Sequence, residues 1–396
     1  MASFAEIADR TTAEELRLRG SLKWTRGEPG VLGAFVAEMD FGIPPAVEAA
    51  LGDVIKRADF GYLSDQAAAE LRQACADWQW SAYGWQVDPA SVWPMADVLK
   101  GLEAAITVFS RPGSPVILPT PAYMPFVTLP GLIGREVIQV PMVAAPDGRL
   151  TLDLDGIDAA FRAGGHLLVL VNPSNPVGRV YSAAELAAVA AVVQAHDGRV
   201  FADEIHAPLV YPGALPPGSR GHVPYASISP EAAGHSVTAV SASKAWNLPG
   251  LKCAQLIVAS DADAAAWARA WPLYEHDAST LGAWATIAAY AGGRAWLSDV
   301  VGYLDGSRQL LAQLLAEHLP GVRYRAPEGT YLAWLDCRGL DLRPDPASFF
   351  LERAGVLATD GAACGEAGQG FLRLNFATPR PILAEMIRQM GAAVVG

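Results

Sequence analysis

The 396-residue sequence has few cysteines, few lysines and fewer basic than acidic residues. Its four cysteines, Cys75, Cys253, Cys337 and Cys364, lie far apart and form no C-x-x-C pair. This spacing argues against a disulfide framework and a cysteine-rich zinc site, and it favours a reducing cytoplasm. Because 41 acidic residues face only 29 basic ones, the net charge is −12. A field of that sign repels nucleic-acid phosphates and anionic membranes, so we expect neither as a partner.

The start of the chain and its longest uncharged stretch give no sign of export or of membrane insertion. The first ten residues carry Glu6 and Asp9 where a secretory signal needs a basic start and an apolar run. The uncharged run at 113–134 is long enough to cross a bilayer, but it contains five prolines. Prolines would interrupt a spanning helix repeatedly, so we interpret this run as strand and loop.

Several common site motifs are also missing. The sequence has no G-x-G-x-x-G opening a βα unit, no P-loop and no G-x-S-x-G. These absences argue against dinucleotide, nucleotide and serine-hydrolase sites. The histidines at 166, 196, 222, 235, 276 and 318 form no i,i+4 pair and have no cysteine neighbour. We therefore expect no metal site.

What the sequence does contain is an alternation of short apolar runs and helical patterns, with 52% hydrophobic residues overall. Strand signals lie at 116–118, 136–140, 167–171, 200–202, 237–240 and 255–258, and helical patterns at 46–55 and 183–194. This alternation predicts an α/β fold with a mostly parallel sheet.

The pattern changes after about residue 285. A helical stretch at 299–318 is followed by short strands near 331–335 and 371–375 and by a closing helix from Pro381. The segment up to Pro44 has too little apolar periodicity to fold alone. We therefore expect a large domain at 45–285 and a smaller α+β domain formed by 1–44 together with 286–396.

Three predicted strand ends are followed by residues that can do chemistry. Lys244, one of only five lysines, follows the strand at 237–240. A lysine beyond the carboxyl end of a strand has a pKa lowered by partial burial, which suits imine formation with an aldehyde; a solvated turn lysine is the alternative. Asp203 follows the strand at 200–202, and Asn175 lies in a turn rich in Pro, Asn and Gly. Taken singly, each of these two is equally an ordinary loop residue.

Taken together, the three strand ends have the order and spacing of pyridoxal-5′-phosphate (PLP) enzymes of fold type I. The pattern N-P-x-N-P-x-G at 172–178, D-E-x-H at 203–206 and S-x-S-K at 241–244 resembles the class I/II aminotransferase superfamily. The strings F-V-A-E-M-D-F at 35–41 and S-K-A-W-N-L-P-G-L-K at 243–252 resemble its MalY/PatB-type branch of cystathionine and cysteine-S-conjugate β-lyases. The resemblance covers nearly the whole chain. It implies a large domain with helices on both faces of its sheet.

The resemblance also implies roles for the strand-end residues. Lys244 would form the imine with the cofactor aldehyde and later remove the substrate α-proton. Asp203 would keep the pyridine nitrogen of PLP protonated, so that the ring accepts electrons. Asn175 would donate a hydrogen bond to the phenolic oxygen of the ring, and Tyr123 would stack on the ring.

Further positions match the family's phosphate and substrate contacts. The phosphate would be held by Ser241, Ser243, Lys252 and the backbone N–H groups of Ala96, Asp97 and Val98 at a helix start. The Asp97 carboxylate would repel a phosphate unless it turned away to cap that helix. Tyr62 matches a tyrosine that reaches the phosphate of the other subunit, which implies a homodimer with shared sites. Arg373 matches the arginine that binds the substrate α-carboxylate, beside Ala37.

Two positions depart from the usual aminotransferase pattern. His206 replaces a tyrosine, and Lys252 replaces an arginine. Both differences favour the lyase branch of the resemblance. His206 would lie near the phenolic oxygen of the ring, or else be a buried histidine with a structural role.

The resemblance implies a PLP-dependent carbon–sulfur β-lyase that acts on L-cystathionine or another S-substituted L-cysteine. Two alternatives stay open. An aminotransferase shares every step up to loss of the α-proton and then yields a keto acid. A PLP-binding regulator without catalysis is a third reading, which the presence of Lys244, Asp203 and Arg373 disfavours.

Overall fold

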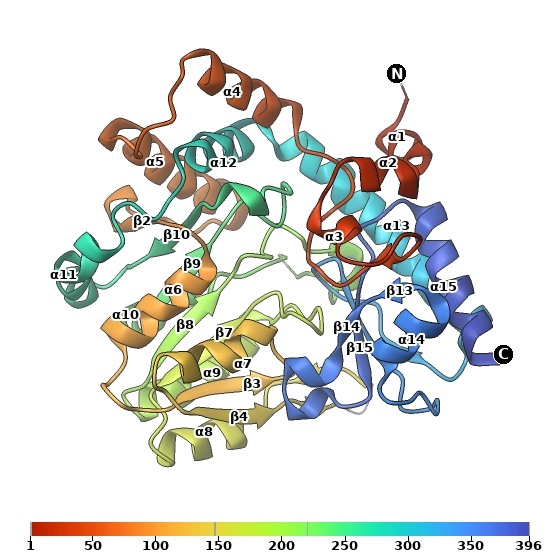
Figure 1. The fold of residues 1–396 in the computed structure, drawn as a ribbon. Coiled ribbons are helices and arrows are strands. Elements are labelled where there is room, and N and C mark those ends of the chain that lie inside the picture. The colour runs from red at the N-terminus through yellow and green to blue at the C-terminus, as the bar shows by residue number, and fades with distance from the viewer. Residues whose placement is uncertain (1, 146–147, 220, 396) are drawn as a thin grey trace.

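A seven-stranded sheet forms the centre of the computed structural model, which describes residues 2–145, 148–219 and 221–395 (Figure 1). Its strands, in spatial order, are β2 (Val92–Met95), β10 (Ala254–Ile257), β9 (Ser236–Val240), β8 (Arg199–Asp203), β7 (Leu167–Val171), β3 (Val116–Thr120) and β4 (Val137–Pro141). Neighbouring strands pair in parallel, except that β10 is antiparallel to both β2 and β9. The predicted α/β class with a mostly parallel sheet is confirmed.

Both faces of this sheet are buried, which explains why its strands are apolar at successive positions. In β7, Leu167 and Val169 belong to one core cluster and Leu168 and Leu170 to another. The first cluster includes residues of α6 (Val98–Ala104), α7 (Met124–Leu132) and α11 (Asp261–Ala270). The second includes residues of α8 (Leu154–Arg162), α9 (Ala183–Ala195) and α10 (Pro230–Gly234). Helices therefore cover both faces, as predicted.

Two sequence interpretations need correction. The short strand β2 was not expected, because its four residues include Pro94 and give only a weak strand signal. The uncharged run at 113–134 contains the helix α7 as well as the strand β3, so reading it as strand and loop was wrong in part. Pro125 lies in the first turn of α7, where no intrahelical N–H is required. Within the described residues, no helix is both long and apolar enough to cross a membrane.

A second sheet, of four strands, lies beside the first. Its order is β11 (Arg323–Tyr324), β12 (Leu332–Asp336), β15 (Phe371–Asn375) and β14 (Thr359–Asp360). The helices α13 (Arg294–His318), α14 (Pro346–Ala354) and α15 (Arg380–Val395) surround it. The remaining elements include α4 (Pro45–Lys56), α5 (Asp65–Tyr83) and α12 (Thr280–Gly292), which pack together, and the small pair β5 (Val143–Ala144) and β6 (Leu150–Thr151).

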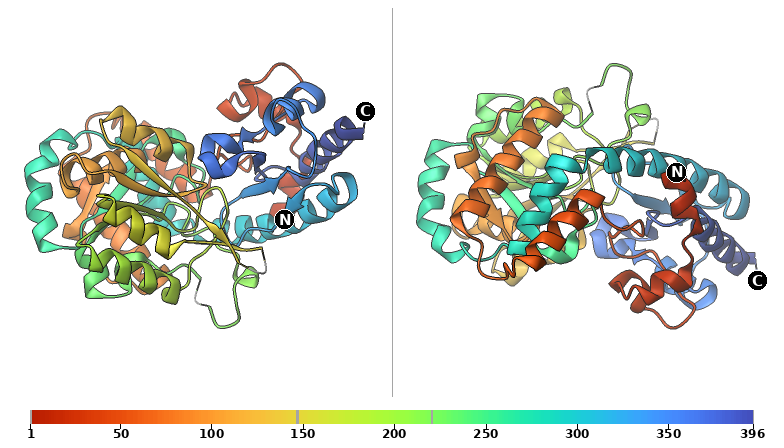
Figure 2. Two further views of the ribbon diagram at one scale, coloured as in Figure 1. Left: turned by 90° about the horizontal axis from the view of Figure 1, so that it is seen from below. Right: turned by 90° about the horizontal axis from the view of Figure 1, so that it is seen from above.

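The N-terminal segment lies against the C-terminal part of the chain (Figure 2). The strand β1 (Leu32–Gly33) pairs in parallel with β13 (Val356–Leu357), and α1 (Phe4–Arg10) packs on α13. The division into domains at 45–285 and at 1–44 with 286–396 stays a prediction.

A buried ion pair attaches the short helix α3 (Leu22–Thr25) to this assembly. Lys23 is 1% exposed, and its Nζ donates to Asp40 Oδ2 at 2.8 Å and to the Ala377 carbonyl at 3.1 Å. Trp24 Nε1 donates to the other oxygen of Asp40 at 2.8 Å. Both carboxylate oxygens are thus bound, which offsets the cost of removing the charges from water. The segment after β1 and the helix α3 are held together by this one carboxylate.

Replacing Lys23 by alanine leaves Asp40 buried without its cation. We expect Lys23→Ala to lower the free energy of unfolding by about 3–5 kcal/mol, as for other broken buried pairs. Urea denaturation would measure this loss. Lys56→Ala, which removes an exposed pair with Asp53 of similar length, is the control and should change stability by less than about 1 kcal/mol. Equal losses in the two variants would contradict the anchoring role.

Candidate functional site

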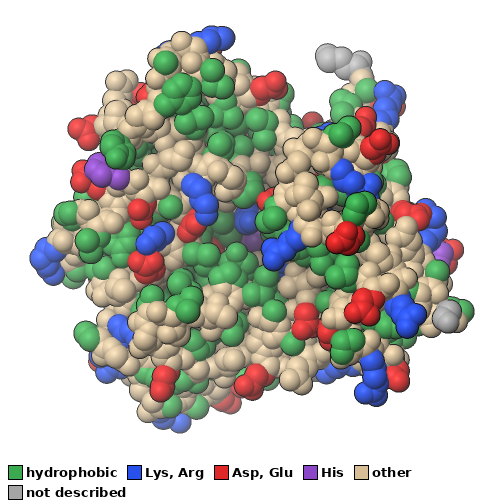
Figure 3. All heavy atoms as spheres, in the orientation of Figure 1, with side chains coloured by type: hydrophobic (Ala, Val, Ile, Leu, Met, Phe, Trp, Pro, Cys, Tyr) green, Lys and Arg blue, Asp and Glu red, His purple; other side chains and the backbone are tan. Residues whose placement is uncertain are grey.

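A cavity of about 340 Å³ opens at the carboxyl ends of the parallel strands. It appears as a hollow in the surface with several Lys and Arg side chains around it (Figure 3). Every predicted site residue except Tyr62 lines it: Ala37, Ala96, Asp97, Val98, Tyr123, Asn175, Asp203, His206, Ser241, Ser243, Lys244, Lys252 and Arg373. The roles assigned to these residues stay predictions, but the chain does bring the residues together.

The topology explains this convergence. Tyr123, Asn175, Asp203 and Ser241 lie at or after the carboxyl ends of β3, β7, β8 and β9, which are parallel neighbours in the sheet. Such ends meet at one edge, where open α/β sheets bind their ligands. Arg373 reaches the same cavity from β15 of the second sheet. The site therefore lies between the two sheets.

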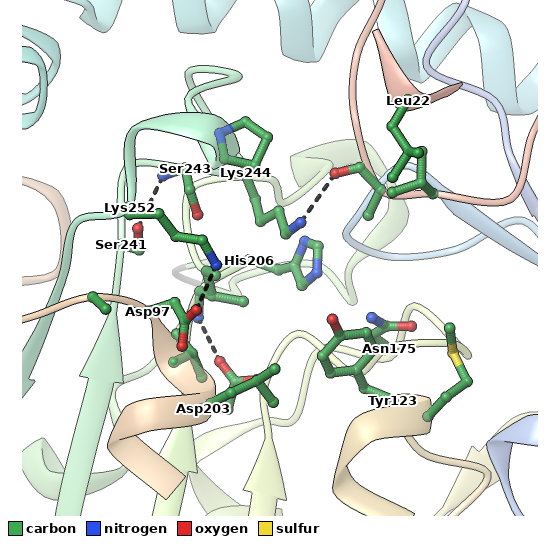
Figure 4. Close-up of a pocket in the computed structure, with 18 of the residues that line it drawn as sticks. Leu22, Asp97, Tyr123, Asn175, Asp203, His206, Ser241, Ser243, Lys244 and Lys252 are labelled. Carbon is green, nitrogen blue, oxygen red and sulfur yellow. Dashed lines mark hydrogen bonds and ion pairs between the residues drawn. The ribbon is translucent and has the colours of Figure 1, made fainter. Parts of the chain in front are cut away.

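Lys244 is in a state suited to nucleophilic and base chemistry. Its Nζ points into the cavity and donates to the Ala37 carbonyl at 3.0 Å (Figure 4). Burial, and next the Arg373 charge, lower the pKa of Lys244 to about 8. A substantial share of this amine is therefore neutral in mildly alkaline solution, and a neutral amine can attack a carbonyl or accept a proton.

Asp203 is a buried carboxyl with one free oxygen. It is 4% exposed, and Oδ1 accepts a hydrogen bond from the Ile205 N–H at 3.1 Å. Burial raises the pKa of Asp203 to about 7, although the Ile205 N–H and the Lys244 charge oppose the rise. Among the described residues no donor is bound to Oδ2. A protonated ring nitrogen at this place would supply the missing donor and cation together.

Arg373 is a buried cation without a carboxylate partner in the described part of the chain. It is 2% exposed; Nη1 donates to Asn175 Oδ1 at 3.1 Å, and Nη2 donates to the Phe35 carbonyl at 2.7 Å and to Thr359 Oγ1 at 3.2 Å. Its Nε is buried and has no hydrogen-bond partner. A guanidinium in this condition is ready to bind an anion. Since Asn175 accepts through its oxygen, its amide N–H groups stay available as donors.

His206 is buried and neutral. It is 2% exposed, and burial, together with the charges of Lys244 and Arg373, lowers the pKa of His206 to about 3. Its Nδ1 has no hydrogen-bond partner, while its ring makes an edge contact with Tyr331 at 6.0 Å between centroids. A histidine that stays neutral offers a nitrogen to a ligand rather than a positive charge.

The end of the cavity lined by Asp97, Ser241, Ser243 and Lys252 is suited to a phosphate, although Asp97 and Lys252 form an ion pair that was not predicted. Asp97 Oδ1 accepts from the Lys100 N–H at 3.0 Å, so its side chain caps α6 as expected. Its other oxygen forms an ion pair of 2.8 Å with Lys252. Ser241 Oγ donates to the Cys253 carbonyl at 2.7 Å and accepts from the Ser243 N–H at 3.1 Å. The hydroxyl of Ser241 is therefore already engaged.

Tyr62 lies outside the cavity of its own chain. It is 79% exposed, and its ring contacts that of His276 at 4.8 Å between centroids. It has no role in this site unless a second copy of the chain brings it there.

Some contacts of the site were not predicted from the sequence, although Phe35 lies in one of the strings that carry the family resemblance. Phe35 and Thr359 bind Arg373 through a backbone carbonyl and a hydroxyl, and Leu22 and Arg26 line the mouth of the cavity. A backbone carbonyl has no residue preference, and mouth residues come from loops that only the tertiary structure brings near. In the described ranges, no group of three or more His, Cys, Asp or Glu side chains is arranged to hold a metal ion.

The donor set fits PLP. Asp203 offers a free oxygen to a ring nitrogen, Lys244 an amine to an aldehyde, and Lys252, Ser243 and the N-terminus of α6 a cationic and N–H-lined place for a phosphate. The buried Nε of Arg373 and Nδ1 of His206 have no hydrogen-bond partner within the described part of the chain.

Comparisons with known proteins agree with this fit. Residues 36–388 match the family model described as aminotransferase class I and II. A cystathionine beta-lyase of Corynebacterium glutamicum is 38% identical over 384 residues, covering 96% of this chain and 98% of that protein. The cystathionine beta-lyase PatB of Bacillus subtilis (strain 168) is 29% identical over 384 residues, covering 94% of this chain and 96% of its own.

A crystal structure of a Corynebacterium diphtheriae protein, assigned there as a PLP-dependent beta-cystathionase, superposes with a TM-score of 0.90. It is 40% identical and covers 98% of each chain. The chain thus belongs to the aminotransferase class I and II family of PLP-dependent proteins. Within that family it resembles the cystathionine β-lyase branch, so the predicted family, branch and cofactor are confirmed.

The buried Asp203 carboxyl makes stability depend on pH in the cofactor-free protein. With a folded pKa near 7 and an unfolded value of 3.8, the folded state binds more protons at this group between about pH 4 and 7. Its contribution to the free energy of unfolding therefore falls as pH rises through that window.

We expect wild type to lose stability relative to Asp203→Asn between pH 4.5 and 7, as measured by urea denaturation of cofactor-free samples. Asp53→Asn, at an exposed carboxylate, is the control and should run parallel to wild type. A wild-type curve parallel to that of Asp203→Asn would show that the carboxyl titrates normally.

Proposed function

We propose that this protein cleaves the carbon–sulfur bond of S-substituted L-cysteines, L-cystathionine among them, by α,β-elimination. Substrate and water are converted to a thiol, pyruvate and ammonia. The observation that carries the proposal is the juxtaposition, in one cavity, of a lysine of lowered pKa with a partner-free carboxylate oxygen and a buried arginine that lacks an anion. The cystathionine β-lyase names of the relatives support the choice of reaction.

Arg373 binds the substrate α-carboxylate in this proposal. Its Nη1 and Nη2 are held by Asn175 and by the Phe35 carbonyl, so the guanidinium plane is oriented before substrate arrives. Its partners are neutral oxygens, so the guanidinium charge still lacks an anion, and a carboxylate would supply one. Ala37 lies beside it and is small enough to leave room.

Lys244 moves the proton. As a neutral amine, Nζ takes the proton from the substrate Cα, and the electron pair released there expels the thiolate from Cβ. PLP, when bound, supplies an electron-accepting ring next to that carbon. Asp203 would keep the ring nitrogen protonated, Asn175 and His206 would contact the phenolic oxygen, and Tyr123 would stack on the ring; all four line the cavity. Lys252, Ser243 and the N–H groups of Ala96, Asp97 and Val98 would hold the phosphate. Ser241 would donate to it only by giving up its hydrogen bond to the Cys253 carbonyl.

The test is a visible absorbance spectrum of the purified protein before and after addition of L-cystathionine, with pyruvate and thiol assayed in the same sample. We expect a cofactor band together with release of both products. Conversion of the band to the pyridoxamine form without pyruvate would establish an aminotransferase instead. A band without any turnover of S-substituted cysteines would leave a PLP-binding regulator.

The role of Lys244 has its own test. Lys244→Ala should reduce pyruvate formation by about 10³-fold or more, because both covalent cofactor attachment and proton removal are lost. Lys56→Ala is the matched control and should keep wild-type activity, because Lys56 is exposed and does not line the cavity. Turnover by Lys244→Ala within tenfold of wild type would contradict the assignment.

We also propose a homodimer whose two sites are shared. The segment around Tyr62 is apolar and exposed, with Phe60 60% and Tyr62 79% accessible, as a subunit interface would be before assembly. The partner subunit's Tyr62 would then reach the phosphate.

We further propose a cytoplasmic location and a division into a large domain at 45–285 and a small domain at 1–44 with 286–396. The four free, buried cysteines support a reducing compartment.

Mixing inactive variants tests the shared site. At a low PLP concentration that still saturates wild type, Tyr62→Ala should bind too little PLP to be active, and Lys244→Ala should be inactive at any PLP concentration. In a mixed dimer one site has an intact Lys244 and an intact tyrosine from its partner. Random exchange should therefore restore roughly a quarter of wild-type activity. A tagged pull-down would show whether the subunits have exchanged. If they have and activity does not recover, the shared site is contradicted.

A further inference from the structure

One of the cations that line the cavity has no role in the proposed reaction. Its lining includes four cations, Arg26, Lys244, Lys252 and Arg373, and two carboxylates, Asp97 and Asp203. Lys252 pairs with Asp97 at the phosphate end, Lys244 serves the chemistry, and Arg373 is assigned to the α-carboxylate. The proposed reaction assigns no role to Arg26.

Arg26 is exposed and free for an anion. Its guanidinium carbon lies 5.4 Å from the centroid of the Phe35 ring. No hydrogen bond or ion pair to Arg26 occurs among the residues that the structure describes. A cation that rests on an aromatic face keeps its N–H groups free at the edges of the guanidinium. Phe35 also accepts a hydrogen bond from Arg373 through its carbonyl at 2.7 Å, so both arginines contact the same residue.

Arg26 directly follows α3 and is positioned at the mouth of the cavity by the buried contacts of that helix. Lys23 and Trp24 bind the buried Asp40, while Leu22 and Arg26, four residues apart and thus on one helical face, line the cavity. Leu22 lies on the side of the pocket away from Asp97 and Lys252 (Figure 4). The mouth and the phosphate end are therefore on different sides of Lys244, and a group that leaves from the substrate has the mouth to occupy.

We propose that Arg26 forms a subsite for a carboxylate carried by the leaving thiol. The inference rests on the proposed lyase function and narrows its substrates to S-substituted L-cysteines whose thiol half ends in a carboxylate a few bonds from sulfur, as that of L-cystathionine does. A guanidinium discriminates such substrates by charge and by paired N–H···O bonds. Leu22 and Phe35 contact the carbon chain between sulfur and carboxylate.

Two substrates that differ only in charge test the subsite. S-(2-carboxyethyl)-L-cysteine and its amide S-(2-carbamoylethyl)-L-cysteine have nearly the same size and leave as similar thiols. For the holoenzyme we expect kcat/KM of the acid to exceed that of the amide by about tenfold or more, the range of a charge-assisted bond. In Arg26→Gln this ratio should fall to about one, and in Arg26→Lys it should stay above that of the glutamine variant.

Arg10→Gln is the matched control, since Arg10 is exposed and outside the cavity; its ratio should equal that of wild type. Raising the ionic strength should lower the wild-type ratio and leave that of Arg26→Gln unchanged. If Arg26 has only a structural contact with Phe35, Arg26→Gln should lower kcat/KM for both substrates by the same factor and keep their ratio. That result would overturn the subsite. If wild type releases pyruvate from neither compound nor from L-cystathionine, the proposed lyase function fails, and the subsite fails with it.

Discussion

A buried guanidinium joins three distant parts of this chain. Arg373, on the second sheet, binds Asn175 beyond the main sheet, the Phe35 carbonyl of the N-terminal segment and the Thr359 hydroxyl. Neutral oxygens orient the cation but do not neutralise it, and a buried charge without a counter-ion is costly. The arrangement makes sense if an anionic substrate supplies the missing charge. A carboxylate bound beside Arg373 would supply the negative charge that these neutral partners lack.

The same segment that orients Arg373 also receives Lys244. Phe35 and Ala37 are two residues apart, and their carbonyls accept from Arg373 and Lys244 respectively. The segment itself is fixed by Asp40, whose carboxylate binds Lys23 and Trp24 of α3. The backbone between Ala37 and Asp40 thus connects the carbonyl that accepts from Lys244 to the buried ion pair. This linkage explains how a short N-terminal stretch, far from Lys244 in sequence, takes part in the site.

Electrostatics separates the roles of the polar groups. Burial pushes the pKa of Lys244 down to about 8 and that of Asp203 up to about 7, so both groups are poised near neutrality. His206, between the same cations, stays neutral. A protonated ring nitrogen at Asp203 would restore its ionised form, because an opposite charge favours the carboxylate. Shifts of this kind are concentrated at functional sites.

The positions of most strands of the large sheet along the chain, the mostly parallel sheet and the set of strand-end residues followed from the sequence. Burial on both faces demands apolar runs, and parallel strands end at one edge. Resemblance in three short motifs added the family and the cofactor. The sequence did not reveal the strand β2, the helix inside the uncharged run, the pairing of Asp97 with Lys252, or the places of Leu22 and Arg26. Those depend on contacts between residues far apart in the chain, through backbone carbonyls and side-chain directions that carry no local pattern. Local chemistry was therefore determined by the sequence, whereas the charge balance of the cavity was decided by tertiary structure.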